Sequence, residues 1–117
     1  MKSFLCAFRG LAVLFCTQRN ARVHLFFLVL AVACGFFFRI SFIEWCLILL
    51  ASGMVLAAEG LNTGLELLAD VVHPERHPQV GRMKDMAAGA VLIAAITAVG
   101  VGIMIFLPKF ISWIAPN

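Results

Sequence analysis

The chain has 117 residues, the size of a single domain, and 63% of them are hydrophobic while 13% are charged. Soluble domains average about 45–50% apolar residues, and a soluble fold of this size has too little interior to bury so much more apolar surface. The composition therefore excludes an ordinary soluble protein. It predicts one all-α integral-membrane domain over residues 1–117, for which we expect no nucleic-acid partner.

The first predicted element is an amphipathic helix at about residues 2–17, within an arm of residues 1–20. Apolar residues share one broad face of this helix, and basic residues lie beside that face. That combination suits a helix lying in the membrane surface, and a short first span broken by Arg9 is the alternative. Phe15 is too bulky for the cleavage site of a signal peptide, so a retained segment is expected.

Three membrane-spanning helices are predicted to follow, at residues 23–38, 42–71 and 86–107. The first is a nearly continuous apolar run, about 24 Å long at about 1.5 Å per residue, slightly short of the ~30 Å hydrocarbon core. Arg39 and Glu44, with Ser41 between them, predict a tight turn that joins the first two spans.

The segment VHPERHPQVGR, at residues 72–82, separates the last two spans. Its prolines, glycine and charged residues predict a water-exposed loop. Pro108 and Lys109 are expected to end the last helix, because proline cannot continue the hydrogen bonding of a helix backbone.

The lysines and arginines predict the orientation in the membrane. With three spans, the arm and the loop at residues 72–82 lie on one side, which carries seven of them: Lys2, Arg9, Arg19, Arg22, Arg76, Arg82 and Lys84. The opposite side carries only Arg39 and Lys109. Positive charge concentrates in cytoplasmic segments, so we expect a multi-pass protein of the cell membrane whose N-terminus and long loop are cytoplasmic.

A stripe of polar residues is the feature that an apolar span does not explain. At about 100° per residue, Glu59, Asn62, Glu66 and Asp70 fall within about 80° of each other on one helix. A carboxylate facing lipid would cost about 2.5–3.5 kcal/mol at mid-membrane, so the stripe must face protein or a wet cleft. If Trp45 marks the outer membrane interface, about twenty residues at about 1.5 Å each reach the inner interface. Glu59 then lies inside the hydrocarbon core and Asp70 in cytoplasmic water, which suggests a site joining a lipid-borne group to a soluble one.

The segment that enters the last helix adds a second candidate feature. Lys84 could hold a phosphate as a point charge, and Asp85 could hold Mg²⁺, which binds through one or two carboxylates and phosphate oxygens. The alternative is an ordinary interfacial lysine followed by an acid that the helix dipole favours. The sequence has no GxxxxGK[ST] motif, so phosphoryl transfer here would not use a P-loop.

These residues together form a longer pattern, which reads Glu59, Asn62, Glu66, Asp70, His77, Arg82, Lys84 and Asp85. The pattern resembles the small bacterial integral-membrane lipid kinases of the prokaryotic diacylglycerol kinase and undecaprenol kinase family. FRGL at residues 8–11 and RNARVHL at residues 19–25 extend the resemblance over nearly the whole chain. The resemblance implies a homotrimeric helical bundle that transfers the γ-phosphoryl group of MgATP to a membrane lipid alcohol, with active sites shared between subunits.

The resemblance also implies roles for single residues on the lipid side of the reaction. Glu59 resembles the base that takes the proton from the lipid hydroxyl. Asn62 should orient the substrate or phosphate, and Arg9 in the arm is assigned with them to substrate binding. Of the two acceptors, undecaprenol is favoured over diacylglycerol.

On the nucleotide side, Glu66 resembles the principal metal-holding carboxylate and also a nucleotide-contacting residue. The other positions that match nucleotide or phosphate contacts are Asp70, His77, Lys84 and Asp85. One position departs from the family, which often has a glutamate where this chain has Gln18. An amide oxygen can still ligate Mg²⁺, so Gln18 is kept as a candidate metal ligand, but it brings no negative charge.

Two other classes of function remain open from the sequence. The polar stripe could be the ion path of a small ion-coupled transporter or channel subunit, although such a path would need acids across the whole membrane. It could also only pair helices, in a structural or assembly subunit.

Overall fold

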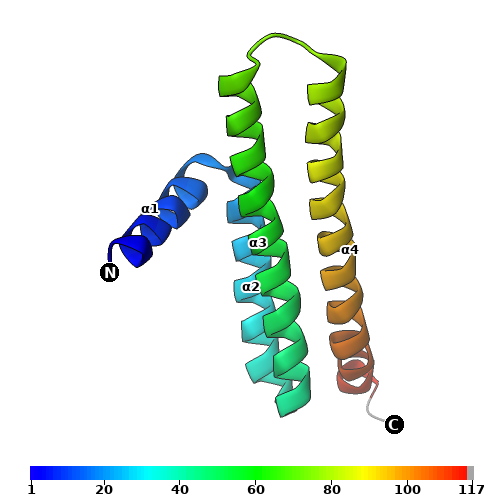
Figure 1. Cartoon of the computed structure of the whole chain (residues 1–117). Coiled ribbons are helices and arrows are strands. Elements are labelled where there is room, and N and C mark those ends of the chain that lie inside the picture. The colour runs from blue at the N-terminus through cyan, green and yellow to red at the C-terminus, as the bar shows by residue number, and fades with distance from the viewer. Residues whose placement is uncertain (116–117) are drawn as a thin grey trace.

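The computed structural model describes residues 1–115, which form four α-helices, labelled in Figure 1: α1 (Lys2–Thr17), α2 (Arg19–Phe38), α3 (Phe42–Val72) and α4 (Pro78–Ile114). No strand occurs in this part of the chain, which confirms the predicted all-α fold. Within it, α2, α3 and α4 are long and apolar enough to cross a membrane. Residues 116 and 117 of the predicted domain lie outside the described residues.

The three long helices form a bundle, and α1 points away from it (Figure 1). The helices α3 and α4 run antiparallel and are joined by a short segment at one end, here called the loop end. At the opposite end of the bundle, here called the turn end, a short turn joins α2 to α3. Buried isoleucines form a small core near the turn end: Ile40, Ile48 and Ile105. Many large apolar side chains remain exposed on all four helices, as expected for surfaces that face lipid or further protein chains.

The turn between α2 and α3 matches the prediction from Arg39, Ser41 and Glu44. Arg39 ends α2 in the left-handed conformation, with φ 53° and ψ 56°. Ser41 and Glu44 form a capping box: the serine hydroxyl accepts from the Glu44 N–H, and the glutamate Oε1 accepts from the Ser41 N–H at 2.9 Å. Trp45 then packs against the backbone of Gly35 and holds the two helices close together.

The junction between α1 and α2 is a single extended residue, Gln18, with φ −106° and ψ 115°. Arg22 stabilises the junction, because its Nη1 donates to the carbonyl oxygens of Phe15 and Cys16, each at 3.0 Å. These carbonyls belong to the last turn of α1, where a positive charge also complements the helix dipole. The helix α2 therefore begins at Arg19, earlier than the predicted span at residue 23.

The last helix is longer than predicted at both ends. The predicted loop at residues 72–82 is wrong: only residues 73–77 lie between the helices, because Pro78 occupies the first turn of α4, where its missing N–H costs nothing. The prediction that Pro108 and Lys109 end this helix is also wrong, since α4 continues to Ile114. Lys109 Nζ donates to Glu44 Oε2 at 2.6 Å and so ties this region to the start of α3.

Candidate functional site

The polar stripe of α3 turns toward the other helices of the bundle. Glu59 is buried, with 2% of its surface exposed, and Thr63 one turn later is buried as well. Asn62 and Glu66 are half-buried, whereas Asp70 near the loop end is exposed. Since α3 is continuous over this stretch, Glu59, Asn62 and Glu66 lie along one side of a single helix.

On this side of α3, three buried side-chain oxygen atoms have no hydrogen-bond partner among residues 1–115. They are Glu59 Oε2, Asn62 Oδ1 and Thr63 Oγ1. Buried polar atoms in folded proteins are nearly always hydrogen-bonded, and each one left without a partner costs about 1–3 kcal/mol. Three such atoms within two turns of one helix make this side of α3 a candidate for contact with a substrate, water or another protein chain.

A histidine on α2 faces the buried carboxylate. The Nε2 atom of His24 lies 3.7 Å from Glu59 Oε2, and the two side chains are 22% and 3% exposed. His24 also lines a groove of about 480 Å³ between α2, α3 and α4. The other side chains that line this groove are nearly all apolar, among them Phe27, Val55 and Phe106.

Sequence reasoning did not select His24 or Thr63 as site residues. His24 could have been found, because an ionisable residue inside an apolar membrane span is a functional candidate by default. Thr63 carries no such signal, since threonine is common in membrane helices that pack closely.

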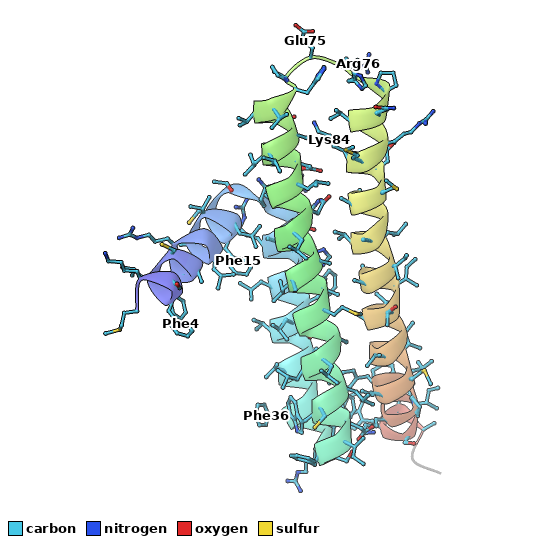
Figure 2. All side chains as sticks on the ribbon, viewed as in Figure 1. Phe4, Phe15, Phe36, Glu75, Arg76 and Lys84 are labelled. Atoms are coloured by element: carbon cyan, nitrogen blue, oxygen red, sulfur yellow. The ribbon has the colours of Figure 1, made fainter. Side chains whose placement is uncertain are left out.

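At the loop end, two predicted nucleotide-binding residues contact each other. Lys84 Nζ lies 2.5 Å from Asp70 Oδ1, so an ion pair bridges α3 and α4. Figure 2 shows Lys84 on the side of α4 that faces α3, below the exposed Glu75 and Arg76 of the connecting segment. Asp85, the next residue of α4, is exposed.

His77, another predicted nucleotide-binding residue, caps the start of α4. Its Nδ1 accepts a hydrogen bond from the Gln79 N–H at 3.1 Å. That bond assigns the proton of the neutral ring to Nε2, which leaves an N–H free to donate to a ligand. The ring of His73 lies edge-on to it, with the centroids 4.9 Å apart.

The two predicted site residues of the arm occupy different positions. Gln18 joins α1 to α2, close to the level of the stripe, because Leu14 four residues earlier packs near Gly60 of α3. Arg9 is exposed on α1, and no hydrogen bond or ion pair within residues 1–115 connects it to the stripe on α3.

The oxygen donors present suit a magnesium ion that is bound mainly by its substrate. Among residues 1–115, no group of three or more histidine, cysteine and acidic side chains is placed to hold a metal ion. Mg²⁺ does not require such a cage, since it binds through one or two carboxylates together with water and phosphate oxygens. A carboxylate from Glu66 and an amide oxygen from Gln18 fit that chemistry.

Comparison with known proteins gives a consistent match. Residues 5–106 match the family described as prokaryotic diacylglycerol kinase. The chain is 39% identical to the undecaprenol kinase of Bacillus subtilis over 108 residues, which cover 92% of this chain and 88% of that protein.

Two diacylglycerol kinases are similar as well. That of Synechocystis is 38% identical over 111 residues, which are 94% of this chain and 63% of that protein. That of Escherichia coli is 31% identical over 93 residues, which cover 80% of this chain and 76% of that protein.

Proposed function

The chain belongs to the prokaryotic diacylglycerol kinase family, and we propose that it transfers the γ-phosphoryl group of MgATP to undecaprenol in preference to diacylglycerol. Kinases of lipid alcohols are similar to it over most of its length, which makes it a membrane phosphotransferase with a lipid alcohol as acceptor. The choice of undecaprenol is supported by the undecaprenol kinase that is 39% identical to this chain.

The observation that carries the proposal is the buried Glu59 with its unpartnered Oε2. Phosphoryl transfer forms a bond between the lipid oxygen and the γ-phosphorus while the bond from that phosphorus to the β–γ bridging oxygen breaks. The hydroxyl proton leaves as the new bond forms, and Glu59 accepts it. Asn62, one turn away with an orphaned Oδ1, orients the acceptor by hydrogen bonding.

The hydrocarbon part of the acceptor approaches from the membrane. The groove between α2, α3 and α4 is lined almost entirely by apolar side chains and reaches the level of His24, which faces Glu59. Such a lining favours a long hydrocarbon chain over water. A lipid lying along it would present its hydroxyl to the buried carboxylate.

The nucleotide is bound from the loop end, where charged side chains are exposed. Glu66 and Gln18 would hold Mg²⁺, which supplies positive charge to the phosphate oxygens when it is bound. Lys84 and Asp70 contact the phosphates and ribose side of the nucleotide from the ends of α4 and α3. Asp85 and His77 complete this set of contacts, with the His77 Nε2–H as a donor.

The active molecule we propose is a homotrimer in which neighbouring subunits complete each site. Support comes from the exposed apolar surface of all four helices and from the three buried oxygen atoms that lack partners among residues 1–115. Arg9, which is exposed on α1, belongs in this arrangement to the lipid site of a neighbour or to the membrane surface. The N-terminus and residues 73–77 face the cytoplasm, in line with the positive charges on that side.

The test is a transfer assay with purified protein in detergent micelles. Labelled γ-phosphate from ATP is supplied with undecaprenol or diacylglycerol at equal mole fractions, and the lipid product is identified. We expect a higher kcat/KM for undecaprenol, and for Glu59→Gln a residual kcat that is lower by about 10²- to 10⁴-fold. A higher kcat/KM for diacylglycerol would overturn the choice of acceptor. A folded protein that phosphorylates neither alcohol would overturn the assignment as a lipid kinase.

A further inference from the structure

The pairing of His24 with Glu59 points to a function for a residue that the reaction described above does not use. His24 lies on α2 and Glu59 on α3, so the contact joins two helices at a buried position. The distance of 3.7 Å between Nε2 and Oε2 exceeds a hydrogen bond, which needs about 2.7–3.2 Å. Catalytic hydrogen bonds in enzymes without substrate are often long and shorten in the substrate complex.

We propose that His24 is a positioning residue: its Nε2–H donates to Glu59 Oε2 and orients the carboxylate toward the lipid hydroxyl. This inference rests on the proposed lipid-kinase function. It follows from the position of Oε2, which is buried, has no hydrogen-bond partner among residues 1–115 and lies next to His24 Nε2. The histidine is placed to supply that partner when the substrate is bound.

The surroundings offer Glu59 few other charged groups. On α2, Arg22 is engaged with the carbonyl oxygens that end α1. On α4, no charged residue occurs between Asp85 and Lys109. On α1, the turns next to α3 carry only apolar and small side chains around Leu14, and on α3 the adjacent Asn62 and Thr63 are neutral.

The position of His24 in the groove gives the same pairing a second consequence. Of the side chains that line the groove, His24 is the only one with a basic group, and it lies where α2 approaches Glu59. A lipid whose chain follows the groove meets His24, whose Nε2 lies 3.7 Å from Glu59 Oε2.

A matched pair of variants tests the proposal in the full-length protein. His24→Gln keeps an amide N–H near the place of Nε2, whereas His24→Asn carries the same amide on a side chain one methylene shorter. For His24→Asn we expect kcat with undecaprenol to fall by about 10²-fold, the cost of a misplaced catalytic group, with the KM for ATP unchanged. His24→Gln should retain most of kcat.

Glu59→Gln with and without His24→Asn decides whether the histidine acts through the carboxylate. We expect the double variant to be no slower than Glu59→Gln alone. A His24→Asn protein with wild-type kcat would overturn the proposal, and so would a double variant clearly slower than Glu59→Gln. If the wild-type protein transfers phosphate to neither lipid, the proposed function itself has failed, and the role of His24 fails with it.

Discussion

The side chains of Asp70 and Lys84 form an ion pair that connects the loop ends of α3 and α4. Both are partly exposed, at 62% and 34%, so the pair contributes only about 0–1 kcal/mol to stability. Its geometry keeps two residues with nucleotide-binding roles in our proposal within reach of one ligand. A phosphate that binds here would replace Asp70 as the partner of Lys84.

Replacing Lys84 by methionine should therefore weaken ATP binding without unfolding the protein. Hydrogen bonds to charged groups contribute about 1.5–3 kcal/mol, so we expect the KM for ATP to rise by about 10- to 100-fold while the thermal midpoint hardly changes. Steady-state kinetics and thermal unfolding in detergent measure the two quantities. Arg76→Gln, an exposed cation of the connecting segment, serves as control and should leave the KM unchanged. Equal increases in the KM for ATP in the two variants would show that ATP binding depends on the net positive charge of this end and not on Lys84 itself.

Glu66→Gln should weaken magnesium-dependent transfer while the proposed homotrimer persists. The substitution keeps the shape of a half-buried side chain and removes the carboxylate that Mg²⁺ prefers. Titration of activity with Mg²⁺ should show a lower kcat and a higher concentration for half-saturation, and light scattering should show an unchanged mass. Normal turnover at low Mg²⁺ would rule out the metal role. Loss of the oligomer would instead indicate that Glu66 only joins helices.

His77 combines a helix cap with a proposed nucleotide contact, and two substitutions separate them. Asparagine is a strong capping residue, so His77→Asn should keep the cap and remove the imidazole, whereas His77→Ala removes both. We expect His77→Ala to lower stability by about 1 kcal/mol relative to His77→Asn. Both variants should show a raised KM for ATP in kinetic assays. Full activity of His77→Asn would reduce the role of His77 to capping.

Gly35 is predicted to be intolerant of any side chain. A Cβ atom placed there would lie 2.5 Å from Cη2 of the Trp45 ring, far inside van der Waals contact. Gly35→Ala must push the rigid indole away and open the α2–α3 turn, which should cost about 1–3 kcal/mol in thermal unfolding. Gly10→Ala is the matched control, because nothing lies within 4 Å of its Cβ position. A wild-type thermal midpoint for Gly35→Ala would show that the ring moves without cost.

The pair of Glu44 and Lys109 should stabilise the turn end of the bundle. Both side chains are less than one-third exposed, and their contact joins the first turn of α3 to α4 just after Pro108. Glu44→Gln retains an oxygen for the capping box with Ser41 and removes the charge, so it isolates the ion pair from the cap. We expect it to lower the thermal midpoint slightly, and Lys109→Met to do about the same. Non-additive losses in the double variant would confirm direct coupling.

Much of the fold could be predicted because local chemistry decides it. Ser41 and Glu44 carry a capping box in their spacing, and the apolar runs are long enough to require membrane spans. Both proline predictions failed for one reason: the residue type does not reveal its position within a helix. Pro78 stands in the first turn, where proline is favoured, and Pro108 stands inside a long apolar helix that continues past it.

The site was only partly readable from the sequence. Helical periodicity placed Glu59, Asn62 and Glu66 on one side of α3, because that relation is local. The contact of Asp70 with Lys84 depends on the register of the α3–α4 hairpin, and that of His24 with Glu59 on how α2 packs against α3. Residue spacing does not determine how two helices pack against each other, so neither contact could be predicted from the sequence.

The continuity of α3 from Phe42 to Val72 has a mechanical consequence. Between Glu59 and Asp70 the helix advances about 16 Å and returns to within about 20° of the same direction. The unbroken backbone acts as a stiff spacer, so the interval from the proposed proton acceptor, Glu59, to the proposed nucleotide contact, Asp70, is set by helical pitch rather than by a closing flap. Inserting a single alanine between them would swing one set of groups by about 100° relative to the other and uncouple the two halves of the reaction.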